Sequence, residues 1–540
     1  MTMERFDYVI VGAGSAGSVL ANRLTESGRH TVLLLEAGPD DRNFWIRLPI
    51  GYGKSYYDPH VNWMYRSEPI PGLDNRTNYY PRGKLLGGSS SINAMVYSRG
   101  HPGDYDDWEA MGNPGWGWRD VLPVYRRMED HALGSSEWHG AGGPLHITDI
   151  AKTAHPLCQA WLKAGEEAGL AFNPDLNGAT IEGIGLYQLT TRNGFRESTA
   201  RAYLDTARKR PNLEIATGAL AEKILFEGRR ASGVRYRRHG QSIDALAGRE
   251  VIVAAGAING PQLLQLSGIG PASLLRDRGV EIVQANENVG GHLQDHLCYD
   301  HIYRANRPTL NDQLLPWSGR VRVGLQYLLS RSGPLTLSVN QGGGFFRAKA
   351  DSARPDMQLY FSPLSYERAL PGVRAMMKPD PFPGFCTSIS PCRPTSRGFV
   401  RIRSADPNDA PAIEPNMMAT DDDVANLLAG AHFLRKLSET PTFRSVIDEE
   451  LKPGPATQSD AELIADVRAR AYSVFHPVGT CRMGPDARDS VVDPTLRLHG
   501  VGGLRVIDAS IFPTVTSGNT NAPAIMVGEK GAELVLRDSN

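Results

Sequence analysis

A histidine in an apolar stretch and an asparagine-rich turn near the carboxyl end are the residues best suited to moving a proton. His476 lies within residues 474–480, and Asn519 lies within residues 517–523. A neutral imidazole can accept a proton near neutral pH, and an Asn amide can donate to or accept from a substrate hydroxyl. A lone histidine or an Asn-rich turn is more often structural, so neither assigns a chemistry by itself.

A glycine-rich turn at the amino end has the pattern G-x-G-x-x-G, and an acid follows about 20 residues later. Without side chains, the turn lets a pyrophosphate approach the backbone at a helix N-terminus. The acid can accept hydrogen bonds from ribose hydroxyls and disfavours a 2′-phosphate. A glycine turn without a ligand is the alternative. The predicted dinucleotide contacts are Gly12, Gly14, Ser15, Ala16, Gly17, Glu36 and Ala37.

A second loop, residues 83–93, is rich in glycine and serine. Successive backbone N–H groups and hydroxyls in such a loop can form an anion-binding nest, although a plain surface turn has the same composition. We expect this loop to contact the same cofactor, through Gly87, Gly88, Ser89, Asn93 and Ala94.

The elements that would hold these residues follow from apolar periodicity. Residues 6–11 and 31–35 predict two buried strands on either side of a helix, which together form a βαβ unit. Residues 251–255 and 504–507 have the same buried-strand character, and we expect them to join the same parallel sheet.

The middle of the chain changes character, because apolar and polar residues alternate in 356–361 and 399–403. This alternation is typical of an antiparallel sheet with one wet face, and a helix behind the acidic turn 421–423 should cover that sheet. We therefore predict a two-lobed α/β protein with a Rossmann-type parallel sheet and a substrate lobe. Residues 1–300 would be mainly the dinucleotide lobe (with substrate-lobe segments near 45–80 and 150–200), 301–465 mainly the substrate lobe, and 466–540 a return to the first lobe.

Composition excludes several classes of partner. The 540 residues carry 58 Lys plus Arg against 59 Asp plus Glu, so no basic field attracts nucleic acid. The five cysteines are scattered without metal-ligand spacing, which predicts reduced thiols and no metal. No apolar run is long enough to cross a bilayer and no secretory signal begins the chain. We expect a cytoplasmic protein, with peripheral contact at the inner membrane face left open.

Taken together, these blocks resemble the glucose-methanol-choline (GMC) oxidoreductase family, and most closely its bacterial choline dehydrogenase-like alcohol dehydrogenases. The resemblance rests on GAGSAG with LLLEAG, PRGKLLGGSSSINAMVYSRG, GAINGPQLLQLSGIGP, NVGGHLQDHL, FHPVGTCRMG and LRVIDASIFPTVTSGNTNAPAIMVGEK. It implies an FAD held by both glycine loops and by Asp508 and Ala509. It also implies that His476 is the catalytic base and that Asn519 is its partner.

Two positions depart from the family pattern. Ile92 stands where choline-oxidase-like members carry the histidine that bonds to the flavin, so the FAD should be non-covalent. Gly260 stands where a Ser or Thr is usual, and no consequence follows from the sequence.

The resemblance implies oxidation of an alcohol, primary and aliphatic or aromatic, to an aldehyde, with hydride transfer to flavin N5. The electron acceptor is either oxygen or a quinone-type carrier, and we favour the dehydrogenase. Choline dehydrogenation, an oxygen-using oxidase, a redox-neutral lyase, a flavin-binding protein without turnover and an NAD-dependent dehydrogenase remain alternatives. The substrate and the oligomeric state are not indicated. Candidate aromatic lining residues are Tyr52, Tyr57, Trp317, Phe346, Tyr360 and Phe475.

Overall fold

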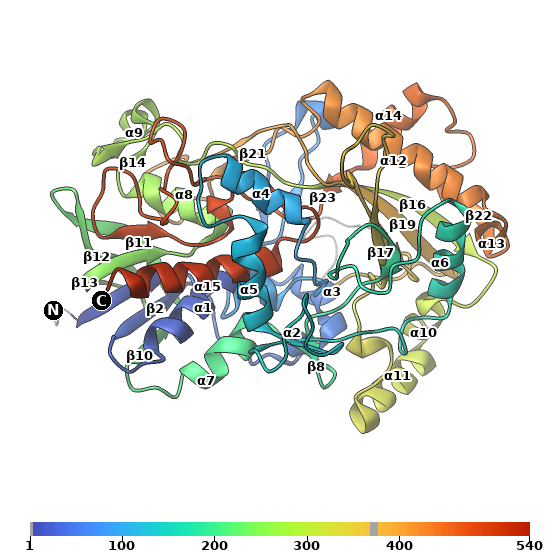
Figure 1. Cartoon of the computed structure of the whole chain (residues 1–540), viewed down its shortest axis with the longest axis horizontal. Helices are drawn as coiled ribbons and strands as arrows, with labels where there is room; N and C mark the ends of the chain where they lie inside the picture. Colours follow the sequence, from blue (N-terminus) through green and yellow to red (C-terminus); the bar gives the residue numbers. More distant parts are fainter. Residues whose placement is uncertain (1–3, 368–375, 540) are drawn as a thin grey trace.

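Two seven-stranded sheets lie side by side and form the centres of two lobes (Figure 1). The computed structural model describes residues 4–367 and 376–539. Both chain ends belong to the same lobe, where the N- and C-terminal segments lie next to each other.

The first sheet combines strands from the beginning, the middle and the end of the chain. In spatial order it contains β10 (Leu213–Thr217), β2 (Val32–Glu36), β1 (Glu4–Val11), β13 (Gln241–Val253), β12 (Arg230–Arg238) and β11 (Ala219–Glu227), with β24 (Leu504–Val506) also paired to β13. The pairings among β10, β2, β1, β13 and β24 are parallel, whereas β11 and β12 are antiparallel. The four strands predicted for this sheet are confirmed.

Two helices bring the two ends of the chain together on this sheet. Helix α1 (Ser15–Thr25) follows the first glycine turn and packs against α15 (Asn521–Arg537). Arg23 of α1 donates to the buried carboxylate of Glu529 on α15 at 2.9 and 2.8 Å. Ser15 donates to the Asn521 side chain at 2.8 Å, so the helix N-termini also meet. The Asn-rich turn before α15 is thereby held beside the glycine turn before α1.

The second sheet is antiparallel throughout. In spatial order it contains β22 (Ile447–Lys452), β16 (Leu297–Ala305), β19 (Gly384–Pro391), β18 (Met357–Ser362), β17 (Gly342–Phe346) and β7 (Gly183–Leu186), with β23 (Tyr472–Ser473) paired to β16. Helix α12 (Asp421–Glu439) packs on β19 and begins with the Thr420 side chain accepting from the N–H of Asp423. The predicted antiparallel sheet and its covering helix are confirmed.

The prediction that one face of this antiparallel sheet is exposed to solvent is wrong for β18. All six residues of β18 are buried. Its apolar residues Met357, Leu359 and Phe361 belong to the lobe's core, while Tyr360 and Ser362 line an internal cavity. The polar side of the alternation therefore faces that cavity instead of solvent. The second alternating segment, β20 (Phe399–Arg401), pairs only with β21 (Ala412–Glu414) and lies outside the large sheet.

All five cysteines are free thiols, and four of them are buried. Within residues 4–367 and 376–539, no helix is long and apolar enough to span a membrane. In the same ranges, no group of three or more His, Cys, Asp or Glu side chains is placed to hold a metal ion.

Candidate active site

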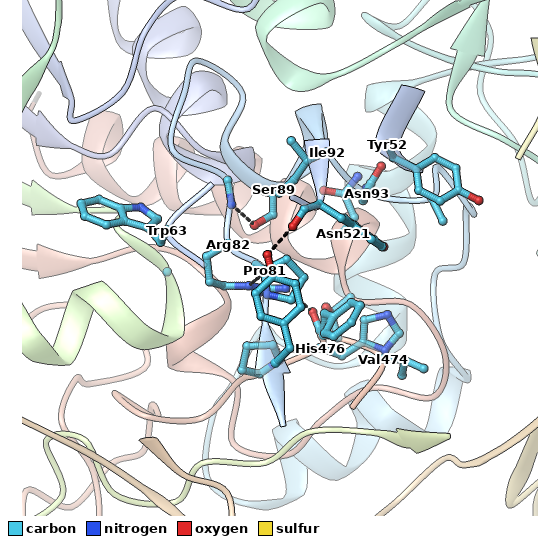
Figure 2. A pocket seen from close by; sticks show the side chains of 18 of the residues that line it. Tyr52, Trp63, Pro81, Arg82, Ser89, Ile92, Asn93, Val474, His476 and Asn521 are labelled. Atoms are coloured by element: carbon cyan, nitrogen blue, oxygen red, sulfur yellow. Dashed lines mark hydrogen bonds between the residues drawn. The ribbon is translucent and has the colours of Figure 1, made fainter. Parts of the chain in front are cut away.

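A cavity of about 980 Å³ is lined by residues of both sheets. A dinucleotide cofactor and a small substrate need a concave site of this scale. Figure 2 shows side chains that line this cavity, among them His476, Asn93 and Asn521 from three different segments of the chain. Fourteen of the predicted residues line the cavity: Gly12, Gly14, Ser15, Ala16, Glu36, Ala37, Gly88, Ser89, Asn93, Ala94, His476, Asp508, Ala509 and Asn519.

Gly17 and Gly87, which were also predicted to contact the cofactor, do not appear in the cavity wall. A Cβ on Gly17 would lie 1.9 Å from the Gly12 carbonyl oxygen, so a glycine is needed to close the turn. Gly87 donates its N–H to the Ala13 carbonyl at 2.8 Å and thereby ties the second glycine loop to the first. Gly17 and Gly87 therefore shape the two glycine loops instead of lining the cavity.

The two glycine loops touch at the cavity wall. Gly88 has φ +52°, and a Cβ there would lie 2.7 Å from the Gly14 Cα. Only a glycine satisfies both the left-handed backbone and the close approach. The two loops therefore present their backbones as one surface, which suits the pyrophosphate of a dinucleotide.

Glu36 lies at the end of β2 with its carboxylate in the cavity wall. Its two oxygens accept from the N–H groups of Ala13 (3.0 Å) and Gly38 (2.9 Å). Burial raises the pKa of this carboxyl to about 7, against the lowering effect of the two N–H donors. A carboxylate oxygen accepts more than one hydrogen bond, so two ribose hydroxyls can still donate to it.

Asp508 lies just after β24, much as Glu36 lies at the end of β2. Its carboxylate accepts from the N–H of Gly256 at 2.8 Å, at the start of α8 (Gly256–Leu266), and from the N–H of Ser510 at 2.7 Å. Burial raises its pKa. A Cβ on Gly260 would lie 3.8 Å from Ser510 Oγ and 3.9 Å from Asp508 Oδ2. The departure at Gly260 thus leaves space beside Asp508 that a Ser or Thr would fill.

His476 and Asn519 meet at the substrate end of the cavity, where the amide Nδ2 of Asn519 lies 3.1 Å from Nε2 of His476. The backbone around His476 is held from two sides. Its N–H donates to Asp295 at 2.7 Å, and Arg82 donates to the carbonyl of Phe475 at 2.6 Å. Phe475 has φ +69°, a strained conformation for an aromatic residue, and such strain is typical of functional sites.

The proton on His476 can be located from its neighbours. Nε2 of His296 lies 3.0 Å from the carbonyl oxygen of Cys392, which can only accept, so His296 carries its proton on Nε2. Its bare Nδ1 then accepts from Nδ1–H of His476, 2.9 Å away. His476 therefore keeps an unprotonated Nε2, the atom that faces Asn519.

The Asn519 amide is oriented in the same way. Tyr360 donates to Oε1 of Gln358 at 2.7 Å, which leaves the Gln358 Nε2 to donate to Oδ1 of Asn519 at 3.3 Å. The Asn519 Nδ2 must then point to His476. The lone pair of His476 Nε2 and the N–H donor of Asn519 Nδ2 are thus placed together at the substrate end of the cavity.

Burial favours the neutral form of both imidazoles. Burial, and then the neighbouring His296 and Arg82, hold the pKa of His476 well below its usual range. Burial also lowers the pKa of His296 to about 4.

Sequence reasoning missed four residues that shape this site: Arg82, Asp295, His296 and Gln358. Asp295 and His296 lie in the block NVGGHLQDHL, whose paired polar residues before a buried strand were a usable signal. Among the aromatic candidates, Tyr52, Tyr57, Tyr360 and Phe475 line the cavity. Phe346 is instead in the lobe's core and Trp317 is exposed.

A Rossmann-type parallel sheet, a second glycine loop and a histidine facing an amide donor are the features expected of an FAD-dependent oxidoreductase. Family models described as GMC oxidoreductase match residues 6–298 and 394–528. The chain belongs to the GMC oxidoreductase family, and it is an FAD-dependent oxidoreductase acting on CH–OH donors.

Relatives match the chain along nearly its whole length. It is 42% identical to an "Alcohol dehydrogenase [acceptor]" of Pseudomonas putida, over 98% of this chain and 96% of the relative. It is 43% identical to an "Oxygen-dependent choline dehydrogenase" of Burkholderia vietnamiensis, over 99% and 94%. Among solved structures, a pyridoxine 4-oxidase from Mesorbium loti has a TM-score of 0.88 and 32% identity, over 98% and 99% of the two chains.

Proposed function

We propose that this enzyme oxidises a primary alcohol to an aldehyde, with His476 as the base and Asn519 as the ligand of the alcohol oxygen. The observation that carries the proposal is the 3.1 Å approach of a bare imidazole nitrogen to an amide N–H donor in the cavity wall. An alcohol oxygen that lies beside both atoms and replaces their direct hydrogen bond would accept from Asn519 and donate its proton to His476. The FAD supplies the hydride acceptor at flavin N5.

The chain's own residues account for the proton step. Neutral His476 accepts the hydroxyl proton on Nε2, and the imidazolium then stabilises the negative charge on the oxygen. His296 remains the acceptor for Nδ1–H throughout, so the ring does not need to turn. Gly12, Gly14, Glu36, the Gly88–Asn93 loop and Asp508 are proposed to hold the cofactor. The proposal includes the division of the chain into a mainly FAD-binding region (1–300), a mainly substrate-binding lobe (301–465) and a C-terminal return to the FAD lobe (466–540).

We favour a quinone-type acceptor over oxygen, which makes the enzyme a dehydrogenase. We place it in the cytoplasm and leave peripheral contact with the inner membrane face open. The name of the Pseudomonas relative specifies an acceptor without identifying it, whereas the name of the Burkholderia relative specifies oxygen, so the names support both alternatives. By the family resemblance, Val474, which lines the cavity, matches a position near the flavin in oxidases of the family, and this is compatible with oxygen use.

A panel of primary alcohols and choline, mixed anaerobically with the enzyme, tests the reaction. A good substrate should bleach the flavin absorbance and yield an aldehyde. Oxygen and a soluble quinone, added separately to the bleached enzyme, then identify the acceptor. Absence of bleaching with every alcohol would instead support a lyase or a flavin-binding protein without turnover.

The FAD is predicted to be dissociable. Ile92 packs against Ile46, Val61 and Leu85 at the cavity wall and has no nucleophilic atom. Acid or heat denaturation should therefore release all of the flavin into the supernatant, measured by absorbance after centrifugation. Flavin that stays with the precipitated chain would contradict this prediction.

Replacing His296 tests how the base is oriented. His296→Ala leaves Nδ1–H of His476 without its buried acceptor, which costs about 1–3 kcal/mol and should slow flavin reduction roughly 10–100-fold. His296→Asn should restore much of the rate, because an Asn oxygen can accept in place of the ring nitrogen. The reduction rate constant should change far more than the apparent affinity for the alcohol. Equal rates in the Ala and Asn variants would show that His296 does not orient the base.

A further inference from the structure

Helix α11 (Trp317–Ser330) presents an apolar stripe to solvent at the lower edge of the molecule (Figure 1). Val323 and Tyr327 form its buried side. The opposite side carries five exposed apolar residues, with Trp317 78% and Leu329 85% exposed; the five are Trp317, Val321, Leu325, Leu328 and Leu329. Their spacing of three and four residues places all five on one face of the helix.

The charged residues on the helix and directly after it are all arginines, and the nearest acid before it in the sequence is Asp312 on α10 (Leu310–Leu314). Arg320 and Arg322 are exposed on either side of the stripe, and Arg331 follows the helix. The sequence from 313 to 350 contains no Asp or Glu. An amphipathic helix with Trp and Leu on one face and arginines beside them is typical of a segment that lies in a membrane interface.

We propose that the face formed by Trp317, Val321, Leu325, Leu328 and Leu329 docks on an anionic lipid bilayer. The 14-residue helix is about 21 Å long, too short to cross the hydrocarbon core and suited to lying in the plane of the headgroups. A second copy of the chain is a poorer occupant. Pairing two such faces would place arginines near arginines with no carboxylate on the helix to compensate them.

The position of α11 relative to the cavity extends the proposed function, because it places the bilayer near the site that would reduce a lipid-soluble acceptor. Helix α11 packs against α10 (Leu310–Leu314). Leu310 and Leu314 belong to one apolar cluster with Tyr52 and Met377, which line the cavity.

Sedimentation with lipid vesicles tests the surface without turnover. The holoenzyme should sediment with vesicles of phosphatidylglycerol and phosphatidylcholine, and less with phosphatidylcholine alone or in high salt. Leu325→Gln/Leu329→Gln should lower the partition coefficient at least about tenfold, because two apolar side chains no longer enter the interface. Met111→Gln/Leu133→Gln, which changes two comparably exposed apolar residues elsewhere, is the matched control and should bind like the wild type.

Dye-linked alcohol oxidation without vesicles should be equal in all three proteins, which shows that the variants are folded and tests the proposed function separately. Wild type remaining in the supernatant would overturn the proposal, as would undiminished binding by Leu325→Gln/Leu329→Gln. A wild-type dimer in gel filtration that this variant converts to monomer would assign the face to self-association instead. Equal binding to vesicles lacking phosphatidylglycerol would overturn the preference for anionic lipid.

Discussion

Replacing His476 with Ala should leave the FAD bound and slow its anaerobic reduction by an alcohol about 10²–10⁴-fold, the usual contribution of a positioned base. The cause is the loss of the bare Nε2 that faces Asn519 at 3.1 Å. Stopped-flow absorbance of the flavin measures the rate directly. Asn519→Ala should also be slower, because the oxygen loses a donor, and Asn519→His should keep partial activity.

The pH profile separates the two roles. Only neutral imidazole accepts a proton, and burial holds the pKa of His476 well below its usual range. Wild-type flavin reduction should therefore be flat across neutral pH and fall only as pH drops through this lowered pKa. Asn519→Ala should retain that acid limb, whereas His476→Ala should lack it. Reduction by His476→Ala within about threefold of wild type, together with an inactive Asn519→Ala, would mean that the two roles are misassigned.

Replacing Glu36 with Ala should weaken FAD binding by about 1.5–3 kcal/mol, the contribution of hydrogen bonds to a charged group, or roughly 10–150-fold in dissociation constant. Titration of the apoprotein with FAD measures this change. Glu227→Ala, which removes an exposed acid on β11 of the same sheet, is the control and should bind FAD normally. Full FAD occupancy of Glu36→Ala through dilution and gel filtration would remove the assignment.

The affinity of the wild type for FAD should also depend on pH. Burial raises the pKa of Glu36 to about 7 in the structure without cofactor. Ribose hydroxyls that donate to the carboxylate favour its charged form, so the bound-state pKa must be lower. FAD affinity should therefore be constant above pH 7 and fall as pH drops below it. Glu36→Gln should lose this dependence while keeping one acceptor oxygen.

The beginning and the end of the chain were predictable because their signals are local. The apolar runs of β1, β2 and β24 and the glycine turn before α1 follow from buried-strand composition and turn geometry within a few residues. The same holds for α12, whose acidic first turn and apolar spacing lie within one helix. The alternation in β18 was visible, but whether its polar side meets water or a cavity depends on which elements cover it.

The family resemblance, the glycine turn and the residue types at 476 and 519 were determined by the sequence alone. The direction of the proton on His476 was decided by the tertiary structure. His296 reaches His476 from 180 residues away, and Gln358 reaches Asn519 from 161 residues away. The periodicity and spacing of residues in a sequence do not predict a contact between segments that meet only after two sheets have packed together. The exposure of the apolar face of α11 was likewise decided by the tertiary structure, because apolar residues at this spacing can equally well face a core.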